Sequence, residues 1–357
     1  MKVAFRVDAS ADIGTGHVRR SLSLALKLRA LGGDVRFVTR SLGVDSVGMI
    51  AGEGFEGSAL LGPPSGVFTP DPDVPHSAWA QVSWERDSAE TIEALADFAP
   101  DWVVMDSYAF DAKWQDAVRA ALHCLIAQIE DMADRRFACD LLIDHNYAGD
   151  HAAKYAGCLP DGARLLGGPR YALLGPAFAD APRYEFDETV RSVGVFMGGD
   201  DAGGFSGAVL DALDAIGFAG DIEVVATSSY VHLADLRERI AARANTKFSL
   251  DLPNLAAFFA RHDLQVGAGG GASWERCCIG VPTLLVVVAE NQRSVAPQLA
   301  ADGIVALAET PDAATLAAQL AELVANPHRR ADLAKRARIL VDGRGAERVA
   351  REIECLT

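Results

Sequence analysis

The chain has 357 residues, half of them hydrophobic, and a formal net charge of −16. This length exceeds what one ordinary hydrophobic core accommodates, so we expect two domains. The acidic balance, with no basic run longer than two residues, argues against nucleic-acid binding by a charged surface. An anionic ligand would instead need local positive potential from helix N-termini or from Arg6, Arg19 or Arg20.

None of the six cysteines forms a C-x-x-C pair, so the sequence indicates neither a zinc site nor a redox motif. Arg6 and Asp8 interrupt the first apolar stretch, which therefore does not resemble a signal peptide. The longest apolar run, 284–289, is far too short to span a bilayer. We therefore expect a soluble cytoplasmic protein that is a monomer or weak dimer and has no nucleic-acid or membrane partner.

In the first half of the chain, strand-like apolar runs alternate with helical periodicity. The expected strands are 3–7, 35–39, 102–106, 124–129 and 141–143, and the expected helices are 18–31, 88–98 and 112–121. This alternation is typical of a parallel sheet with crossover helices.

Residues 157–184 are rich in Gly and Pro and carry little periodicity, so we interpret them as a passage between domains. A second alternating series follows, with strands 193–196, 222–226, 264–266 and 283–288 and helices 205–216, 232–243, 255–260, 273–279, 313–325 and 329–340.

We therefore predict an α/β protein of the GT-B type, in which two doubly wound, Rossmann-like domains face each other across a cleft. The predicted N-terminal domain is 1–168, the inter-domain segment is 169–185, and the C-terminal domain is 186–357. Two unrelated α/β domains would give the same pattern.

The turn GTGH (14–17) joins the first strand to the first helix. Its glycines let the backbone approach a ligand, and the helix directs unpaired N–H groups at it. His17 would lie at the carboxyl end of a parallel strand, where open α/β sheets bind ligands. Histidine is the side chain most often used to take or give a proton at neutral pH, so a role in proton transfer is predicted here. The alternative interpretation is a capping or packing histidine.

The segment GAGGGASWE (267–275) follows an expected strand and opens a helix. Its backbone N–H groups and helix start suit a diphosphate. Its spacing is neither the dinucleotide fingerprint nor a P-loop. Glu275 can accept hydrogen bonds from a ribose diol, or it can simply complement the helix dipole.

Further polar segments follow other strands at the same edges. In the second half these are MGGDD (197–201) and AENQ (289–292), whose amides can hydrogen-bond sugar or phosphate. In the first half, DSY (106–108) should face the same cleft as His17. Asp8 and Asp106 share no metal-ligand spacing, and we expect no metal. We interpret His145, His151 and the remaining histidines as solvated loop residues rather than catalysts.

Several motifs resemble the UDP-2,4-diacetamido-2,4,6-trideoxy-β-L-altropyranose hydrolases of pseudaminic acid biosynthesis, a pathway that supplies flagellin and surface glycans. The matches run in order along nearly the whole chain: RVDASADIGTGHVRR (6–20), DWVVMDSY (101–108), DMADR (131–135), CDLLID (139–144), GPRYALL (168–174), MGG (197–199), ASWERCCIGVP (272–282), NQ (291–292) and VDGRGA (341–346). The first motif and SWERCC (273–278) are specific.

This resemblance implies a GT-B fold similar to MurG-type glycosyltransferases, a UDP site in the C-terminal domain and no metal or cofactor. It implies His17 as catalytic base, Tyr108 and Asn291 as further catalytic residues, and Glu275 as the ribose ligand. The remaining residues that it implies for substrate or UDP binding are Arg6, Asp8, Gly14, Gly16, Arg20, Tyr171, Leu174, Gly198, Gly199, Gly270, Gly271, Ala272, Ser273 and Gln292.

The chain departs from the family at a few positions. The family usually has Asp-His-Tyr where this chain has Asp106-Ser107-Tyr108, and it has a histidine near Phe137. Gly-Gly-Thr-Asp becomes Gly199-Asp200-Asp201. These departures leave the implied catalytic residues in place but bear on which sugar is bound.

Three functions are therefore compatible with the sequence. The first is hydrolysis of a UDP-linked diacetamido-trideoxyhexose to the free sugar and UDP, with C1–O cleavage and inversion. The second is a UDP-sugar glycosyltransferase, and the third is a non-catalytic nucleotide-sugar-binding protein.

Overall fold

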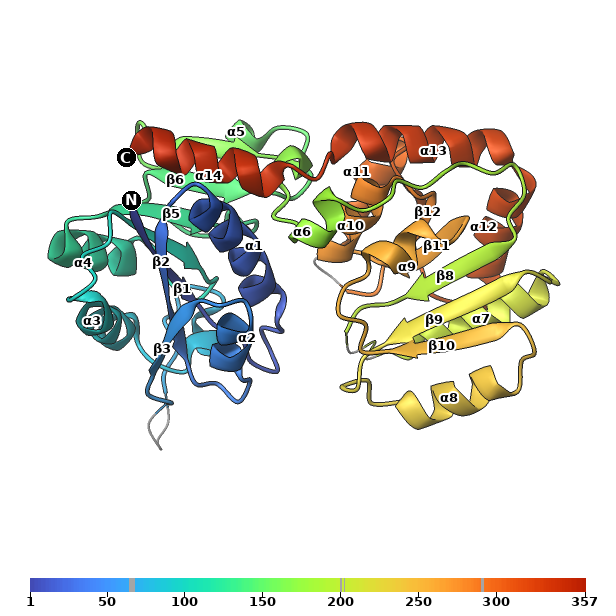
Figure 1. Cartoon of the computed structure of the whole chain (residues 1–357), viewed down its shortest axis with the longest axis horizontal. Coiled ribbons are helices and arrows are strands. Elements are labelled where there is room, and N and C mark those ends of the chain that lie inside the picture. Colours follow the sequence, from blue (N-terminus) through green and yellow to red (C-terminus); the bar gives the residue numbers. More distant parts are fainter. Residues whose placement is uncertain (64–67, 200, 202, 290–291) are drawn as a thin grey trace. The chain divides into compact units, whose positions relative to one another are not determined.

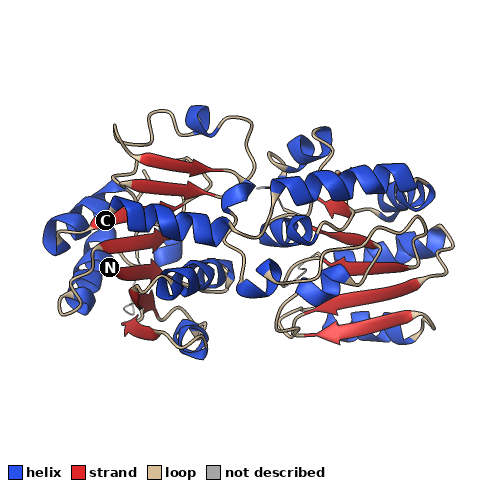
Figure 2. Ribbon diagram, turned by 45° about the horizontal axis from the view of Figure 1, so that its top comes forward, coloured by secondary structure: helices blue, strands red, loops and turns tan. Residues whose placement is uncertain are grey.

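The computed structural model describes residues 1–63, 68–199, 201, 203–289 and 292–357. They form two compact units, each with its own parallel sheet (Figure 1). The first unit comprises Met1–Gly175 and Arg344–Thr357, and the second comprises Pro176–Gly343. In each unit, helices flank the strands, as expected for doubly wound sheets (Figure 2).

The described strands of the first unit form one sheet in the order β3-β2-β1-β4-β5-β6-β7, and all neighbouring pairs are parallel. Their bounds are β1 (Lys2–Val7), β2 (Asp34–Arg40), β3 (Glu56–Leu60), β4 (Trp102–Asp106), β5 (Leu125–Ile129), β6 (Leu141–Asp144) and β7 (Arg164–Gly167).

The central strands are apolar on both faces because helices cover the sheet on both sides. Val3, Phe5 and Val7 of β1 join one buried cluster, whereas Ala4 joins the cluster on the opposite face. The helical elements of this unit are α1 (Gly16–Ala30), α2 (Ser46–Gly52), η1 (Ser77–Ala80), α3 (Trp84–Leu95), α4 (Ala112–Leu122), α5 (His151–Lys154), η2 (Pro169–Tyr171) and α14 (Gly345–Leu356).

The C-terminal helix α14 belongs to the first unit, although the sequence-based boundaries assigned 186–357 to the second domain. It packs against α1 and η2 (Figure 1). Val349, Ala350 and Ile353 of α14 are completely buried in the same cluster as Phe5 and Leu24. Burial of this apolar face stabilises the helix, because an isolated helix of this length is marginal in water.

The second unit repeats the same topology. Its described strands lie in the order β10-β9-β8-β11-β12-β13, and all neighbouring pairs are parallel. The bounds are β8 (Ser192–Phe196), β9 (Asp221–Ala226), β10 (Thr246–Leu250), β11 (Leu264–Ala268), β12 (Thr283–Val286), β13 (Ala306–Ala308), α6 (Pro176–Ala179), α7 (Phe205–Ala215), α8 (Leu233–Ala241), α9 (Ala256–Ala260), α10 (Gly271–Ile279), α11 (Ala296–Ala301), α12 (Ala313–Ala325) and α13 (Pro327–Leu340).

Each sheet has one point where the strand order reverses. In the first unit it lies between β1 and β4, where Val7 is paired with Asp106. In the second unit it lies between β8 and β11, where Phe196 is paired with Gly267. Loops that leave such neighbouring strands run to opposite faces, and ligands of open α/β sheets bind in the crevice between them.

Candidate active site

The turn between β1 and α1 places His17 in the first turn of the helix. Gly14 has φ +72°, a conformation that favours glycine. A Cβ built on Gly14 or Gly16 would meet no atom within 4 Å, so both glycines border open space. The first N–H groups of α1 have no acceptor within the helix, and they can donate to a ligand there.

His17 forms a buried dyad with Asp106, the last residue of β4. His17 Nδ1 lies 2.6 Å from Asp106 Oδ1. Arg20 Nε donates to Asp106 Oδ2 at 2.7 Å, and Ser21 Oγ donates to the same oxygen at 3.1 Å. Burial raises the pKa of Asp106, but Arg20 and His17 outweigh it and hold the pKa well below its ordinary value. Asp106 is therefore a carboxylate that orients the imidazole.

The contact with Asp106 selects the tautomer of His17. A carboxylate oxygen at 2.6 Å requires a proton on Nδ1, because two lone pairs would otherwise face each other. Arg20 Nη2 lies 3.1 Å from His17 Nδ1 and donates to Asp106 Oδ1 instead. Nε2 then carries the lone pair of the neutral ring, and it can take a proton from a nucleophile.

Tyr108 packs edge-on against His17, with ring centroids 4.8 Å apart and an interplanar angle of 79°. Burial raises the pKa of Tyr108 well above its ordinary value, Arg20 opposes this shift, and nearby acidic groups add to it. The phenol is therefore a hydrogen-bond donor at all ordinary pH values. His76 and Trp79 extend the aromatic cluster, and each ring centroid lies 6.0 Å from that of Tyr108.

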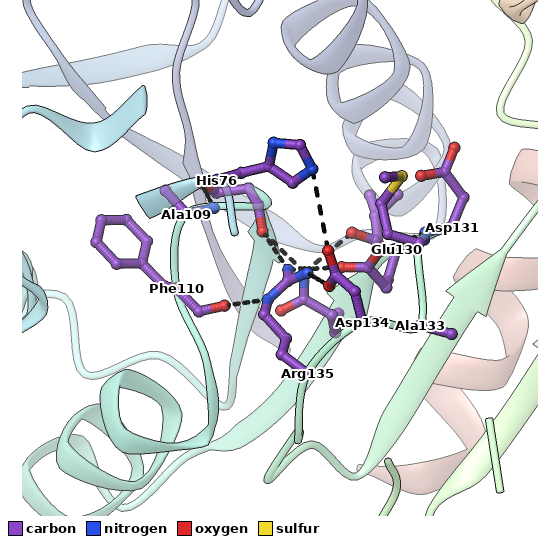
Figure 3. A network of polar contacts seen from close by, with 12 residues as sticks. His76, Ala109, Phe110, Glu130, Asp131, Ala133, Asp134 and Arg135 are labelled. Atoms are coloured by element: carbon purple, nitrogen blue, oxygen red, sulfur yellow. Dashed lines mark hydrogen bonds and ion pairs between the residues drawn. The ribbon is translucent and has the colours of Figure 1, made fainter. Parts of the chain in front are cut away.

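The buried Arg135 forms hydrogen bonds with the backbone of the loop that contains Tyr108 (Figure 3). Arg135 Nε donates to Phe110 O at 2.8 Å, and Arg135 Nη2 donates to Ser107 O at 3.1 Å. These carbonyls lie on either side of Tyr108 in the chain. Arg135 also pairs with Asp134 at 2.8 Å. Arg135, in the loop after β5, thus holds the position of Tyr108.

Arg6 and Asp8, both proposed ligand contacts, lie in a buried ion network. Arg6 Nε donates to Asp87 Oδ1 at 3.0 Å, and Arg6 Nη1 contacts Asp8 Oδ1. The backbone N–H of Arg40 donates to Asp8 at 2.6 Å. Arg6 and Asp8 are 0% and 3% exposed. The network joins β1, β2 and α3, and a direct contact of either residue with a ligand stays a prediction.

His145 lies in the loop after β6 but is buried, so its interpretation as a solvated residue is wrong. Its Nδ1 has no hydrogen-bond partner among the described residues. Burial, with the positive charge of Arg20, lowers the pKa of His145 to about 4. The negative charges of Asp131 and Asp106 raise the pKa of His145, but by less than burial and Arg20 lower it. The structure thus adds a neutral imidazole to the surroundings of the dyad.

This depressed pKa predicts acid destabilisation. Folding favours neutral His145, so its contribution is present above the ordinary pKa of 6.5 and is lost as pH falls toward 4. We expect His145→Gln to flatten the pH dependence of the unfolding free energy by about 3 kcal/mol over that window. Denaturant titrations of both proteins would measure it. The same change at exposed His328 is the control, and a pH dependence unchanged by His145→Gln would contradict the assignment.

In the second unit, glycine loops leave β8 and β11. Gly198 and Gly270 both have φ +100°. A Cβ on Gly198, Gly199, Gly270 or Gly271 would meet no atom within 4 Å, so these loops border open space. Helix α10 begins at Gly271, where its first N–H groups lack helical acceptors. This arrangement suits a phosphate group.

The remaining proposed contacts of this unit lie around the same loop. Gln292 Oε1 accepts from Val288 N at 2.9 Å, and its Nε2 lies 3.4 Å from Gly269 O. Glu275 is half-buried in α10, Ala272 is half-buried and Ser273 is buried, as the exposure of each side chain shows. Asn291, the third proposed catalytic residue, lies outside the described residues. The ligand roles of the others stay predictions.

Tyr171 and Leu174 lie in the first unit, in and just after η2, which packs against α14. Leu174 is buried and Tyr171 packs against the core.

Among the described residues, no group of three or more His, Cys, Asp or Glu side chains is arranged to hold a metal ion. No helix within the described ranges is long and apolar enough to cross a membrane.

No family model matches the chain. The spore coat polysaccharide biosynthesis protein SpsG of Bacillus subtilis is 31% identical over 192 residues, which cover 52% of this chain and 57% of SpsG. The chain spans little more than half the length of the curated relatives it matches.

Solved structures match the chain over its whole length. MurG of Acinetobacter baumannii has a TM-score of 0.69 at 15% identity and covers 99% of both chains. The glycosyltransferase SnogD of Streptomyces nogalater has a TM-score of 0.67 at 17% identity and covers 100% of this chain and 99% of its own. At such identities the likeness shows the fold, and the predicted GT-B fold is confirmed.

Proposed function

We propose that this chain is an enzyme that acts on a nucleotide-linked sugar. The observation that carries the proposal is the His17–Asp106 dyad, a carboxylate-oriented imidazole at the switch point of the first sheet. Its Nε2 is suited to remove a proton from an oxygen nucleophile. The name of SpsG, a polysaccharide biosynthesis protein, supports a substrate of the sugar class.

The second unit would bind the nucleotide, which we propose to be UDP. The diphosphate would lie over the glycine loops that follow β8 and β11, which border open space. Glu275, one turn into α10, would accept hydrogen bonds from the ribose hydroxyls. Helix N-termini favour the negative charge that develops on a departing diphosphate.

The chemistry is a substitution at the anomeric carbon. The nucleophile gives its proton to His17 Nε2 and forms a bond to C1, while the C1–O bond breaks and UDP leaves with that electron pair. Attack opposite the leaving group inverts the anomeric centre. Tyr108, a protonated phenol beside His17, would donate a hydrogen bond to the sugar or to a phosphate oxygen.

Two nucleophiles fit this chemistry. Transfer to an acceptor hydroxyl is better supported by the comparisons, since SnogD is a glycosyltransferase and SpsG is named for polysaccharide biosynthesis. Hydrolysis by water, to give a free diacetamido-trideoxyhexose and UDP, is supported by the motifs RVDASADIGTGHVRR (6–20) and SWERCC (273–278).

Incubation with a UDP-linked diacetamido-trideoxyhexose, followed by proton NMR, separates these possibilities. A hydrolase releases the free sugar without any acceptor, and the spectrum reports the anomer formed. A transferase turns over slowly or not at all until an acceptor is added. UDP binding without product in either case would contradict an enzymatic role. In ¹⁸O-water, label in UDP rather than in the sugar would contradict attack at carbon.

Glu275 tests the nucleotide half of the proposal. Losing a charge-assisted hydrogen bond costs about 1.5–3 kcal/mol, so Glu275→Ala should weaken UDP binding roughly 10- to 150-fold. KM should rise more than kcat falls, because the ribose contact exists in ground and transition states alike. Calorimetry measures the affinity, and Glu238→Ala, a change at an exposed residue of α8, is the control. Unchanged affinity in a folded Glu275→Ala protein would place the nucleotide elsewhere.

A further inference from the structure

Arg276, one turn into α10, is a buried cation directly beside the second glycine loop. Its side chain is 1% exposed. Arg276 Nη2 donates to Ala268 O at 2.6 Å and lies 3.3 Å from Ser273 Oγ. Its Nε and Nη1 have no hydrogen-bond partner among the described residues. Buried polar groups are normally paired, so these two atoms need an explanation.

The charge of Arg276 is offset in part: its guanidinium carbon lies 5.8 Å from the centroid of the Phe259 ring, and the neighbouring Glu275 favours the charged form. The buried Arg6 of the first unit pairs with both Asp8 and Asp87, whereas Arg276 has no ion pair within the described part of the chain. Burial lowers the pKa of Arg276 to about 10, so the guanidinium still carries its charge at neutral pH. A buried charge without an ion pair is costly to a fold, and a bound anion beside Arg276 would offset that cost.

The backbone around the loop is shaped to admit this guanidinium. A Cβ built on Gly267 would lie 2.3 Å from Arg276 Nη1 and 2.5 Å from Phe196 O. Only glycine therefore fits at 267 while Arg276 holds this position. Since Phe196 ends β8 and Gly267 belongs to β11, the guanidinium lies at the switch point of the second sheet. Gly270 and Gly271, which follow, border open space.

We propose that Arg276 supplies the fixed positive charge that selects a nucleoside diphosphate at this loop. It acts through the backbone of 267–273 and is thus a positioning residue rather than a direct ligand. A full charge beside backbone dipoles, in a poorly screened interior, adds to the field of the α10 N-terminus. This inference rests on the proposed nucleotide site of the second unit. It narrows the ligand class to phosphate-bearing nucleotides, because an uncharged nucleoside would gain nothing from the charge.

The test compares UDP with uridine, which shares the base and ribose but lacks phosphate. Affinities of both are measured by calorimetry or ligand-observed NMR for the wild type, Arg276→Met and Arg276→Lys. Arg330→Met is the matched control, because Arg330 is also a completely buried arginine of the second unit and contacts the carbonyls of Leu323 and Glu188. We expect Arg276→Met to weaken UDP binding about tenfold or more and to leave uridine binding within about twofold.

Arg276→Lys, which keeps the charge, should preserve the ratio of UDP to uridine affinity, and so should Arg330→Met despite its lower thermal stability. Equal losses for UDP and uridine in Arg276→Met, or no loss, would overturn the proposal. If Arg276→Met does not fold, the neutral variant Arg276→Gln takes its place with the same two outcomes, and a collapsed ratio in Arg276→Lys overturns the proposal. A wild-type protein that binds no UDP would instead refute the proposed function.

Discussion

Replacing His17 with alanine should lower kcat of the proposed reaction by about 10²–10⁴-fold, the usual contribution of a general base. The side chain contributes the Nε2 lone pair that accepts the proton of the nucleophile, and alanine offers no substitute. UDP binding should survive, because the glycine loops and Glu275, which we propose to hold the nucleotide, lie in the second unit. Turnover measured by NMR and UDP affinity measured by calorimetry give the two numbers.

His328→Ala is the matched control for this experiment. His328 lies in α13, is exposed, and should tolerate the change without loss of turnover. Because His17→Ala leaves Asp106 without one of its donors, thermal unfolding should accompany the kinetics to show that the variant is folded. A folded His17→Ala protein with near-full activity would contradict the role of His17.

The strands that the sequence predicts are those buried on both faces. Strands such as β1 and β4 read as continuous apolar runs, because helices cover both sides of a parallel sheet. The prediction missed β3, β7, β10 and β13. Strand β13 has three residues, and β7 lies in the segment 157–184, whose glycines and prolines obscure it. Hydrogen bonding to β6 makes β7 a strand, and a local pattern does not contain that information.

The position of α14 shows a second limit. Ala346, Val349, Ala350 and Ile353 are spaced for one helical face, so the sequence does contain the signal for this helix. The pattern does not indicate which part of the protein this apolar face packs against. Contacts between residues at opposite ends of the chain decide that α14 covers the first sheet rather than the second.

The sequence predicts those parts of the site whose positions follow from the order of the strands. Asp106 and Tyr108 were expected near His17 because they follow a neighbouring strand, and the structure brings them together. His145 and Arg276 were not identified, because their significance comes from burial and missing partners. His145 directly follows a predicted strand, and a polar residue at such an end was the available signal. Arg276 lies inside a predicted helix, where no such signal was available.

Replacing Asp106 with asparagine should reduce both stability and activity, and by more than any exposed substitution. Asp106 is fully buried and accepts hydrogen bonds from His17, Arg20 and Ser21. The isosteric amide leaves Arg20 without its negative partner, which costs about 3–5 kcal/mol when a buried pair is broken. It also no longer fixes the proton on His17 Nδ1, since an amide can donate as well as accept. We expect kcat to fall by up to about 10⁴-fold, as for loss of an orienting carboxylate.

The pH dependence of the unfolding free energy tests whether the negative charge of Asp106 is what the asparagine variant loses. The pKa of Asp106 is held below its ordinary value of 3.8, so its stabilising contribution is present above that pH and is lost as pH falls below it. The stability difference between wild type and Asp106→Asn should therefore be largest near neutrality and should narrow below about pH 4. Asp101→Asn is the control at the opposite, exposed end of β4, where Asp101 accepts a hydrogen bond from Lys2 N at 2.7 Å. It should cost about 1 kcal/mol or less. A difference that stays constant with pH would mean that asparagine disrupts packing at this position, and that the Arg20–Asp106 charge pair is not what holds His17.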